Sequence, residues 1–274
     1  MSHTYIFEEL LFELIETPQD EKLLEFFSDY ENSFIIEEEK ETFSWFQECL
    51  SLNTGETSKQ LTELYGVYKE LIIIVRDSTT QERIAGINFV AFWGESDCIT
   101  ANLSYVFVNA LYRQKGILKK IMNLLPDFLR WQFAPATPPK KVYMFIEQNH
   151  PLKMSPENYK RDSEFTGLDQ KQRLDIWKKQ GAKILDFSYI QPPLSTTQTA
   201  EHSLIYSVIG AQESDFDSWL LLIHLKRFFA ISVLKGGDIY ANTEVTQQFV
   251  FLETLAKDKK RVPLCETLEE CRLV

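Results

Sequence analysis

Hydrophobic and polar residues recur along this chain with two different periods, and each period predicts one kind of element. Short apolar or alternating runs predict strands at Leu71–Val75, Ile84–Trp93, Ile99–Val108, Val142–Ile146, Lys183–Ile190 and Ser203–Ile209. Apolar residues three and four positions apart predict helices near Pro18–Tyr30, Lys40–Leu50, Gly116–Trp131, Asp169–Gln180, Phe216–Leu234 and Thr243–Lys257. Leu10–Ile15 fits either a short strand or the start of a helix. This order predicts an α+β fold, an α/β/α sandwich in which helices cover a mixed sheet.

Capping residues sharpen two helix boundaries. Asp169 suits an N-cap, Gln172 stands at the capping-box position, and Gly181 suits the left-handed residue that ends a helix. Pro126 lies inside the predicted helix Gly116–Trp131, where we expect it to kink or split the helix because proline lacks an N–H group.

Composition limits the classes of protein that remain. The chain has 274 residues, of which 44% are hydrophobic, so it can bury a core; we expect a main domain at 1–211 and a C-terminal helical extension at 212–274. Four cysteines without a CxxC motif and four histidines without HxxxH predict neither a disulfide framework nor a metal site. We therefore expect a reducing, cytoplasmic compartment.

The most apolar stretch, Trp219–Leu234, contains His224, Lys226 and Arg227 near its centre. Each charge would cost about 2.5–3.5 kcal/mol in a bilayer, so this stretch is predicted to be a core or interface helix and not a membrane span. A homodimer or an oligomeric scaffold built through this helix remains open. The N-terminus has no basic segment before its apolar residues, so no secretory signal is predicted.

The net charge of −11 is unevenly distributed. Residues 1–50 contain 14 acidic and two basic residues, a balance of −12, and the rest of the chain sums to +1. An acidic chain without a basic stripe is a poor partner for a phosphate backbone, so nucleic acid is not expected as a partner.

One segment points to chemistry. A strand ending at Val108 is followed by Arg113-Gln114-Lys115-Gly116 and then by a helix, whose first N–H groups and partial positive charge form an anion site. Gly116 allows close approach of the backbone, and Arg113 and Lys115 add positive charge.

This segment resembles the phosphate-binding signature [Q/R]-x-x-G-x-[G/A] of the GNAT superfamily of N-acetyltransferases. Arg113 and Gly116 match the signature, whereas Leu118 departs from its final Gly or Ala. The preceding FVNALYR, the following strand and the helix ending in WKKQGA also resemble the family, over about Leu10–Gly210. The resemblance implies a mostly antiparallel mixed sheet whose central strands, Ile99–Val108 and Val142–Ile146, splay apart around acetyl-CoA. It implies these residues at the cosubstrate: Phe107, Val108, Arg113, Gln114, Lys115, Gly116, Ile117, Leu118 and Asn149.

The implied reaction needs a base, because an amine attacks only when neutral and a lysine-like amine has a pKa of about 10.4. Glu147, after an apolar strand, is the main candidate, and Asp97 is a weaker one; Glu147 could equally be a solvated carboxylate at a strand end. The thioester would meet the acceptor near Tyr105 and Glu147, although Tyr105 also fits a packed aromatic residue. Cys98 has no neighbouring histidine in sequence, so an acyl-enzyme route is not expected.

Many family members use a tyrosine to protonate the leaving thiolate, and that position here is Trp177. Either Tyr105, Tyr159 or Tyr189 supplies a hydroxyl, or the thiolate leaves unassisted, or catalysis is lost.

Three further features concern the acceptor. A 19-residue polar insertion follows Asn149 and is either a lid, with His150 and Tyr159 as contacts, or a surface loop. Gln191 is a candidate for orienting the substrate. Glu37, Glu38 and Glu39 form either a solvated face or an acidic wall that steers a cationic amine.

The sequence therefore predicts an acetyl-CoA-dependent N-acetyltransferase that transfers acetyl directly to a primary amine, with no metal. A small cationic or amino-acid-like acceptor is the first hypothesis and a peptide amine the second. The alternative function is a non-catalytic acyl-CoA-binding or interaction module that retains the fold.

Overall fold

The computed structural model of the chain describes residues 4–34, 40–95, 97–133, 139, 141–193 and 198–272. The chain divides into two compact units, Met1–Trp93 with Ala101–Val142, and Gly94–Thr100 with Tyr143–Val274. Glu37, Glu38 and Glu39 lie outside the described residues. Of the helices within the described ranges, none is long and apolar enough to span a membrane.

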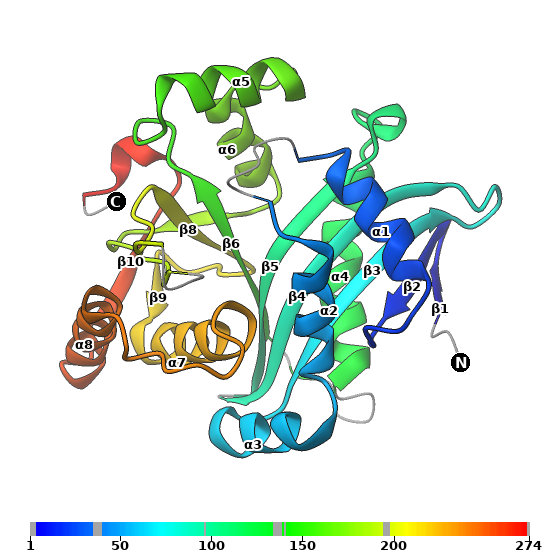
Figure 1. Cartoon of the computed structure of the whole chain (residues 1–274). Coiled ribbons are helices and arrows are strands. Elements are labelled where there is room, and N and C mark those ends of the chain that lie inside the picture. The colour runs from blue at the N-terminus through cyan, green and yellow to red at the C-terminus, as the bar shows by residue number, and fades with distance from the viewer. Residues whose placement is uncertain are drawn as a thin grey trace. The chain divides into compact units, whose positions relative to one another are not determined.

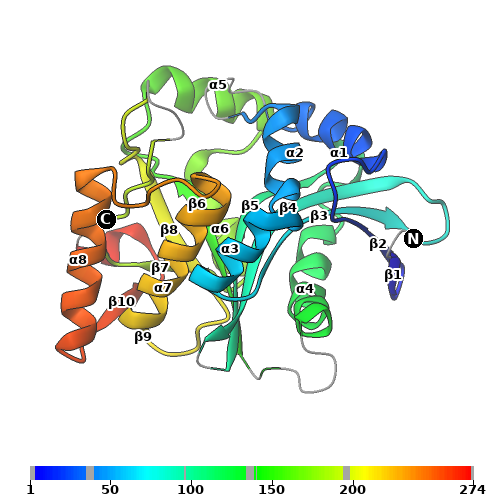
Figure 2. The same ribbon diagram turned by 60° about the horizontal axis from the view of Figure 1, so that its bottom comes forward.

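The first unit is an antiparallel sheet with helices on both faces (Figures 1 and 2). Its strands follow one another in the sheet in chain order from β1 to β5. Its elements are β1 (Thr4–Phe7), β2 (Leu10–Ile15), α1 (Lys22–Glu31), α2 (Phe43–Ser51), α3 (Gly55–Tyr65), β3 (Tyr68–Asp77), β4 (Arg83–Glu95), β5 (Cys98–Val108), the 3₁₀ turn η2 (Ala110–Tyr112) and α4 (Ile117–Phe133).

Side chains of each strand alternate between the two faces of the sheet, so this unit has an apolar core on each face. Ile72 and Ile74 of β3 face α1 and α2, where Phe26 and Phe46 are fully buried against them. On the other face Phe12 contacts Phe128 of α4, with ring centroids 6.0 Å apart. The same alternation places Arg76 on the α1 side of the sheet, which explains the ion pairs described next.

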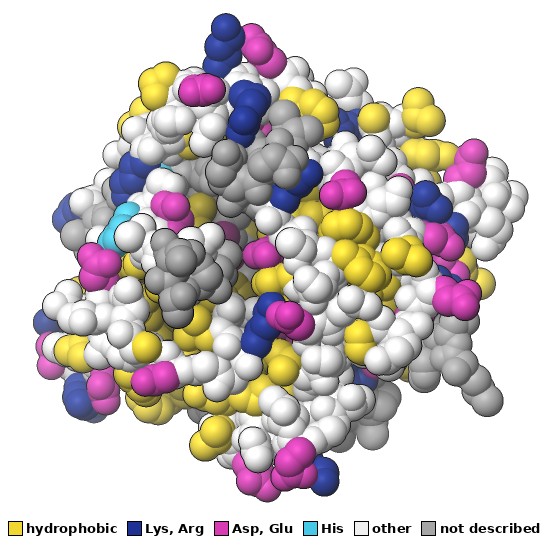
Figure 3. Space-filling view, in the orientation of Figure 1, with side chains coloured by type: hydrophobic (Ala, Val, Ile, Leu, Met, Phe, Trp, Pro, Cys, Tyr) yellow, Lys and Arg dark blue, Asp and Glu magenta, His cyan; other side chains and the backbone are white. Residues whose placement is uncertain are grey.

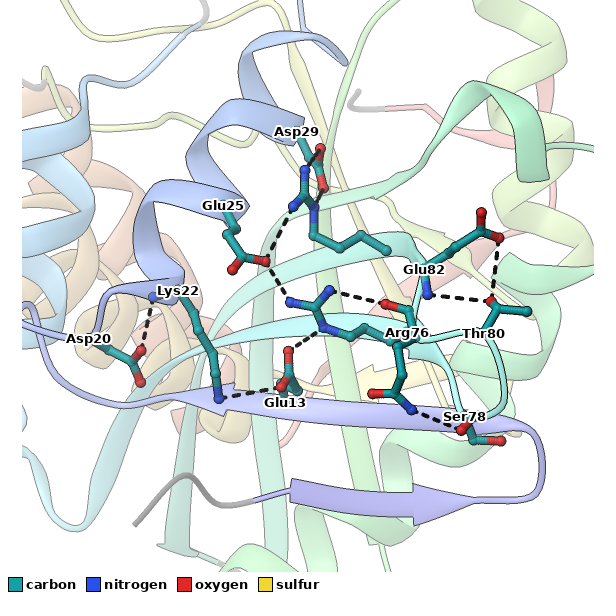
Figure 4. A network of polar contacts seen from close by, with 11 residues as sticks. Glu13, Asp20, Lys22, Glu25, Asp29, Arg76, Ser78, Thr80 and Glu82 are labelled. Atoms are coloured by element: carbon teal, nitrogen blue, oxygen red, sulfur yellow. Dashed lines mark hydrogen bonds and ion pairs between the residues drawn. The ribbon is translucent and has the colours of Figure 1, made fainter.

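Figure 4 shows a network of ion pairs between the sheet and α1. Arg76 lies between Glu13 of β2 and Glu25 of α1, at 2.5 Å from each, and Arg83 contacts Glu25 at 3.2 Å and Asp29 at 2.7 Å. Burial alone would raise the pKa of Glu25, but the hydrogen bonds and charges of Arg76 and Arg83 outweigh it and lower that pKa. Three of the 14 acidic residues in the N-terminal segment, Glu13, Glu25 and Asp29, are therefore paired with arginines from later strands.

The second unit contains a five-stranded sheet in the order β6-β8-β7-β10-β9, with antiparallel pairing. Its elements are β6 (Lys141–Asn149), α5 (Pro156–Thr166), α6 (Gln170–Lys179), β7 (Lys183–Leu185), β8 (Leu204–Ile209), β9 (Asp215–Asp217), α7 (Ser218–Phe228), the π-helix η3 (Phe229–Val233), α8 (Thr243–Lys257), β10 (Arg261–Cys265) and the 3₁₀ turn η4 (Leu268–Glu270). Tyr206 of β8 packs toward α7, and Ile205 packs toward Leu174 of α6.

The α+β class and the mostly antiparallel sheet are confirmed, with three corrections to individual elements. Pro126 does not split α4, because the buried side chains of Met122, Leu125 and Leu129 hold the helix on both sides of it; the other expectation for Pro126, a kink, stays a prediction. The strand predicted at Lys183–Ile190 ends at Leu185. The polar insertion after Asn149 contains a helix, α5, whose N-cap is Ser155.

The C-terminal segment is also more than a pair of helices. β9 and β10 pair with each other, and β10 pairs with β7, so residues after 211 extend the sheet.

On the face seen in Figure 3, side chains of both charge signs lie interspersed.

Candidate functional site

The turn between β5 and α4 has the backbone that its sequence predicts. Gln114 and Gly116 both have positive φ angles, +62° and +76°, and Ile117 begins the helix. The Gly116 carbonyl accepts the first helical hydrogen bond, from the Lys120 N–H at 3.1 Å. A Cβ atom on Gly116 would meet nothing within 4 Å, so glycine is needed for its φ angle, and the space beside it is open.

Two basic residues of this turn have different surroundings. Arg113 donates from Nε to the Val108 carbonyl at 3.0 Å and so closes the turn onto the end of β5. Lys115 is exposed, with Nζ 4.9 Å from the centre of the Tyr112 ring. Leu118, which departs from the family signature, is half-buried in the first turn of α4. Exposed N–H groups and a nearby ammonium can hold a diphosphate.

Tyr105 and Phe107 belong to the aromatic cluster between the sheet and α1. The Tyr105 ring lies 4.8 Å from the Tyr30 ring, and their hydroxyl groups hydrogen-bond. Burial raises the pKa of Tyr30 to about 12. Phe107 is buried against Gly86, where a Cβ atom would come within 2.3 Å of its ring. Both residues therefore have packing roles, and their predicted roles at the thioester stay predictions.

Glu147 has a specific partner. It lies near the end of β6 and is half-buried, and the Tyr189 hydroxyl donates a hydrogen bond to its Oε1 at 2.5 Å. Tyr189 is 4% exposed and follows the short strand β7. Its pKa is raised well above the ordinary value, first by burial and then by the charge of Glu147. The hydroxyl thus stays protonated at neutral pH, and Tyr189 serves as a donor to the carboxylate.

An aromatic stack extends this pair into the core of the second unit. Tyr189 stacks on Tyr206 at 4.5 Å, and Tyr206 stacks on Phe145 at 5.4 Å. The Tyr206 hydroxyl hydrogen-bonds Nε2 of His224 on α7 at 2.9 Å. Burial lowers the pKa of His224 well below its ordinary value, and the charge of Arg227 lowers it further, so the ring is neutral.

A glutamine on α8 fixes the backbone beside Tyr189. Gln248, 5% exposed, accepts from the Ile190 N–H at 2.8 Å and donates to the Ile190 carbonyl at 3.2 Å. Phe229 packs against the Tyr189 ring with centroids 6.1 Å apart. The C-terminal helices therefore hold the segment that carries the Tyr189 hydroxyl.

Sequence reasoning missed Tyr206, His224 and Gln248 as contributors to this group. Gln248 could have been recognised from the sequence, because it is a polar residue on the buried face of α8 between Val245 and Phe249. Tyr206 could be recognised only from the register, which pairs it with Glu147 across β6 and β8.

The remaining candidates lie as follows. Asn149 ends β6 and is half-buried. His150 is 6% exposed, and its Nδ1 accepts from the Leu152 N–H at 3.2 Å; burial lowers its pKa. The Tyr159 hydroxyl donates to Asp169, the N-cap of α6, whose capping box with Gln172 is confirmed.

Three more candidate residues, Gln191, Trp177 and Asp97, lie outside the groups described above. Gln191 pairs through its backbone with Glu201. Trp177 is half-buried on α6, and Asp97 has a φ angle of +51° just before β5. Within the described ranges, one group of metal-ligating side chains lies together, Asp186, Cys265 and Cys271.

Comparison with known proteins supports the fold. No family model and no curated protein sequence matches the chain. A solved structure described as an acetyltransferase of the GNAT family, from Bacteroides thetaiotaomicron, matches with a TM-score of 0.51 and 16% identity, over 83% of this chain and 99% of that one. The chain has the GNAT fold.

Two other solved structures with this fold match less well. A chimera of Vibrio cholerae spermidine N-acetyltransferase SpeG and hSSAT has a TM-score of 0.39 and 10% identity, over 74% of this chain and 95% of its own. Arabidopsis thaliana Naa50, in complex with a bisubstrate analogue of CoA, has a TM-score of 0.39 and 12% identity, over 72% and 96%.

Proposed function

We propose that this chain is an acetyl-CoA-dependent N-acetyltransferase that transfers acetyl directly to a primary amine, with Glu147 as the general base. The GNAT fold makes this reaction class the first to consider, and the residues of the site support it. The observation that carries the proposal is the half-buried carboxylate of Glu147, held by the buried Tyr189 hydroxyl at 2.5 Å.

The turn at Arg113–Gly116 would bind the diphosphate of acetyl-CoA. The first N–H groups of α4 are oriented for an anion, Lys115 adds a positive charge, and the open space beside Gly116 admits a phosphate. Strand residues Phe107 and Val108 would bond the pantetheine arm through their backbone. Acetyl-CoA supplies the activated acetyl group.

Glu147 would take one proton from the acceptor ammonium or amine, directly or through one water. The neutral amine nitrogen then forms a C–N bond with the thioester carbonyl carbon, the C–S bond breaks, and CoA leaves as a thiolate. An acceptor that enters as an ammonium ion carries one further proton on nitrogen, which is released to solvent to leave the neutral amide. The Tyr189 hydroxyl donates its proton to the hydrogen bond with Glu147, so it does not serve as the acid for the leaving thiolate. Trp177 occupies the position of the family's tyrosine acid, and the thiolate would leave without that acid.

The acceptor class proposed here is a small cationic or amino-acid-like amine, with a peptide amine second. The alternative, a non-catalytic acyl-CoA-binding module, is favoured by Leu118 and Trp177, which both depart from the catalytic family pattern.

Calorimetry with CoA and an assay of free CoA across a panel of amines would test the proposal. We expect CoA to bind, and acetyl transfer to fall at least 100-fold in Glu147→Gln, as expected for loss of a general base. Glu157→Gln, an exposed carboxylate on α5, is the matched control and should keep full activity. CoA binding without thiol release would favour the binding module, and no CoA binding would reject both functions.

A further inference from the structure

Asp186, Cys265 and Cys271 bring three metal-ligating atoms together at the C-terminal end of the second unit. One carboxylate oxygen and the two sulfur atoms all lie within 4.8 Å of one another. Asp186 and Cys265 are 6% and 5% exposed, and Cys271 is half-buried. The ligand atoms of the cluster are therefore largely shielded from bulk water.

The backbone around this cluster fixes all three side chains. β7 and β10 pair at Cys265 and Ile184, and the Asp186 N–H donates to the Pro263 carbonyl at 2.9 Å just beyond the end of β7. The 3₁₀ turn η4 then brings the chain back, so that Cys271 lies beside Cys265. The Arg272 N–H donates to Oδ1 of Asp186 at 2.8 Å and orients the carboxylate.

The spacing of these atoms suits a tetrahedral cation. Zinc bonds of about 2.3 Å to sulfur and about 2.0–2.2 Å to oxygen place neighbouring ligand atoms about 3.5–3.8 Å apart. The cluster therefore needs only a small contraction to close around one ion. Two sulfur ligands favour a soft or borderline metal over magnesium or calcium, which prefer oxygen ligands.

We propose that Asp186, Cys265 and Cys271 bind one divalent cation of the zinc class, with a water molecule as the fourth ligand on the half-exposed side of Cys271. On binding, each thiol loses its proton to solvent and forms one metal–sulfur bond, and Cys271 gives up its contact with the Thr267 carbonyl at 3.6 Å. The cation links the C-terminal turn to Asp186, three residues before Tyr189. It would thereby restrict the segment that carries the Tyr189 hydroxyl.

Sequence analysis predicted no metal site, because the ligands are far apart in the chain and form no CxxC motif. Asp186 comes from the end of β7, and the two cysteines flank η4 nearly 80 residues later. Only the pairing of β7 with β10 brings them together.

Cobalt provides a direct test that does not depend on enzymatic activity. The full-length protein is reduced, stripped of metal with a chelator and titrated with Co²⁺ without oxygen. We expect one equivalent to give the near-ultraviolet absorption of thiolate–cobalt bonds and the intense visible bands of tetrahedral cobalt. Zn²⁺ should then abolish both, and should raise the thermal midpoint of the stripped protein.

Variants locate the site. Cys265→Ser and Cys271→Ser should each remove most of the thiolate–cobalt absorption, and Asp186→Asn should weaken binding while leaving some. Cys98→Ala, a buried cysteine outside the cluster, is the matched control and should titrate like the unmodified protein.

Two outcomes overturn the proposal, and neither requires a variant to fold. One is the absence of thiolate–cobalt absorption in the reduced, unmodified protein. The other is the loss of two titratable thiols on isolation that a reductant restores without any metal being present, which would assign the pair to a disulfide. Neither outcome affects the proposed acetyl transfer, which is measured separately.

Discussion

The Tyr189–Glu147 hydrogen bond leads to the most informative prediction, tested by Tyr189→Phe. This change removes one oxygen atom and keeps the ring, which stacks on Tyr206 at 4.5 Å and contacts Phe229 at 6.1 Å. Packing should survive because the shape of the ring is unchanged. The variant therefore isolates the donor to the carboxylate.

The expected loss of activity follows from the charge of Glu147 and from the length of its hydrogen bond with Tyr189. The O–H···O contact of 2.5 Å is in the range of hydrogen bonds to an ionised carboxylate, which contribute about 1.5–3 kcal/mol. If this hydrogen bond is what holds the Glu147 carboxylate in the position from which it acts as the base, its loss lowers kcat/KM about 10- to 150-fold. Stability should change by less than this, because Glu147 is only half-buried and water can replace part of the lost bond.

The assay is free CoA released with an amine that the unmodified enzyme acetylates, measured from pH 5 to 10. A changed pH–rate profile in this variant would show that the hydrogen bond acts on the ionisation of the base. An unchanged profile in Tyr189→Phe, with Glu147→Gln inactive, would show that the hydrogen bond does not govern the base. Full activity in Glu147→Gln would refute the base itself.

The remaining predictions concern packing, pH and the C-terminal helices. Gly86→Ala should destabilise the first unit by about 1–3 kcal/mol in chemical denaturation, because its Cβ atom would lie 2.3 Å from the Phe107 ring. The lowered pKa of His224 means that its contribution to stability is present above about pH 6.5 and is lost as pH falls below that value, because the unfolded state then binds more protons. Acid denaturation should accordingly be less steep in His224→Gln. Gln248→Ala removes both hydrogen bonds to Ile190 and should lower kcat more than it raises KM, and an unchanged kcat in a folded variant would contradict the positioning role.

Local signals in the sequence predicted several element boundaries correctly. The capping box at Asp169, the turn glycine at Gly116 and the bounds of α8 at Thr243–Lys257 all match the structure. These features are determined within a few residues, by side chains that satisfy the ends of a helix or by a φ angle that only glycine adopts easily.

Elements that depend on distant partners were not predictable in the same way. α3 buries only Leu61, and α5 buries only Asp162, so neither has the apolar stripe that marks a helix in sequence. β10 is recognisable as a strand only through its pairing with β7 and β9. Elements of this kind form because the rest of the fold supplies their contacts.

The candidate site likewise combines a local motif, which the sequence predicts, with contacts between distant residues, which it does not. The Arg113–Gly116 turn is a local motif and could be found from spacing, whereas the partner of Glu147 could not. Tyr189 is 42 residues away, and it meets Glu147 because β7 ends early and Gln248 holds the following backbone.

The ion pairs also change how the N-terminal acidity is interpreted. Counted along the chain, residues 1–50 carry a charge of −12, which suggested steering of a cationic amine. In space, Glu13, Glu25 and Asp29 are paired with Arg76 and Arg83 from later strands, so their field at a distance is largely cancelled (Figure 4). Steering, if it operates, must therefore come from other acidic residues of this segment, and the run Glu37–Glu39 is the one to neutralise. Substitution of that run should raise the KM for a cationic acceptor, whereas an unchanged KM would leave these acids as solubilising charge.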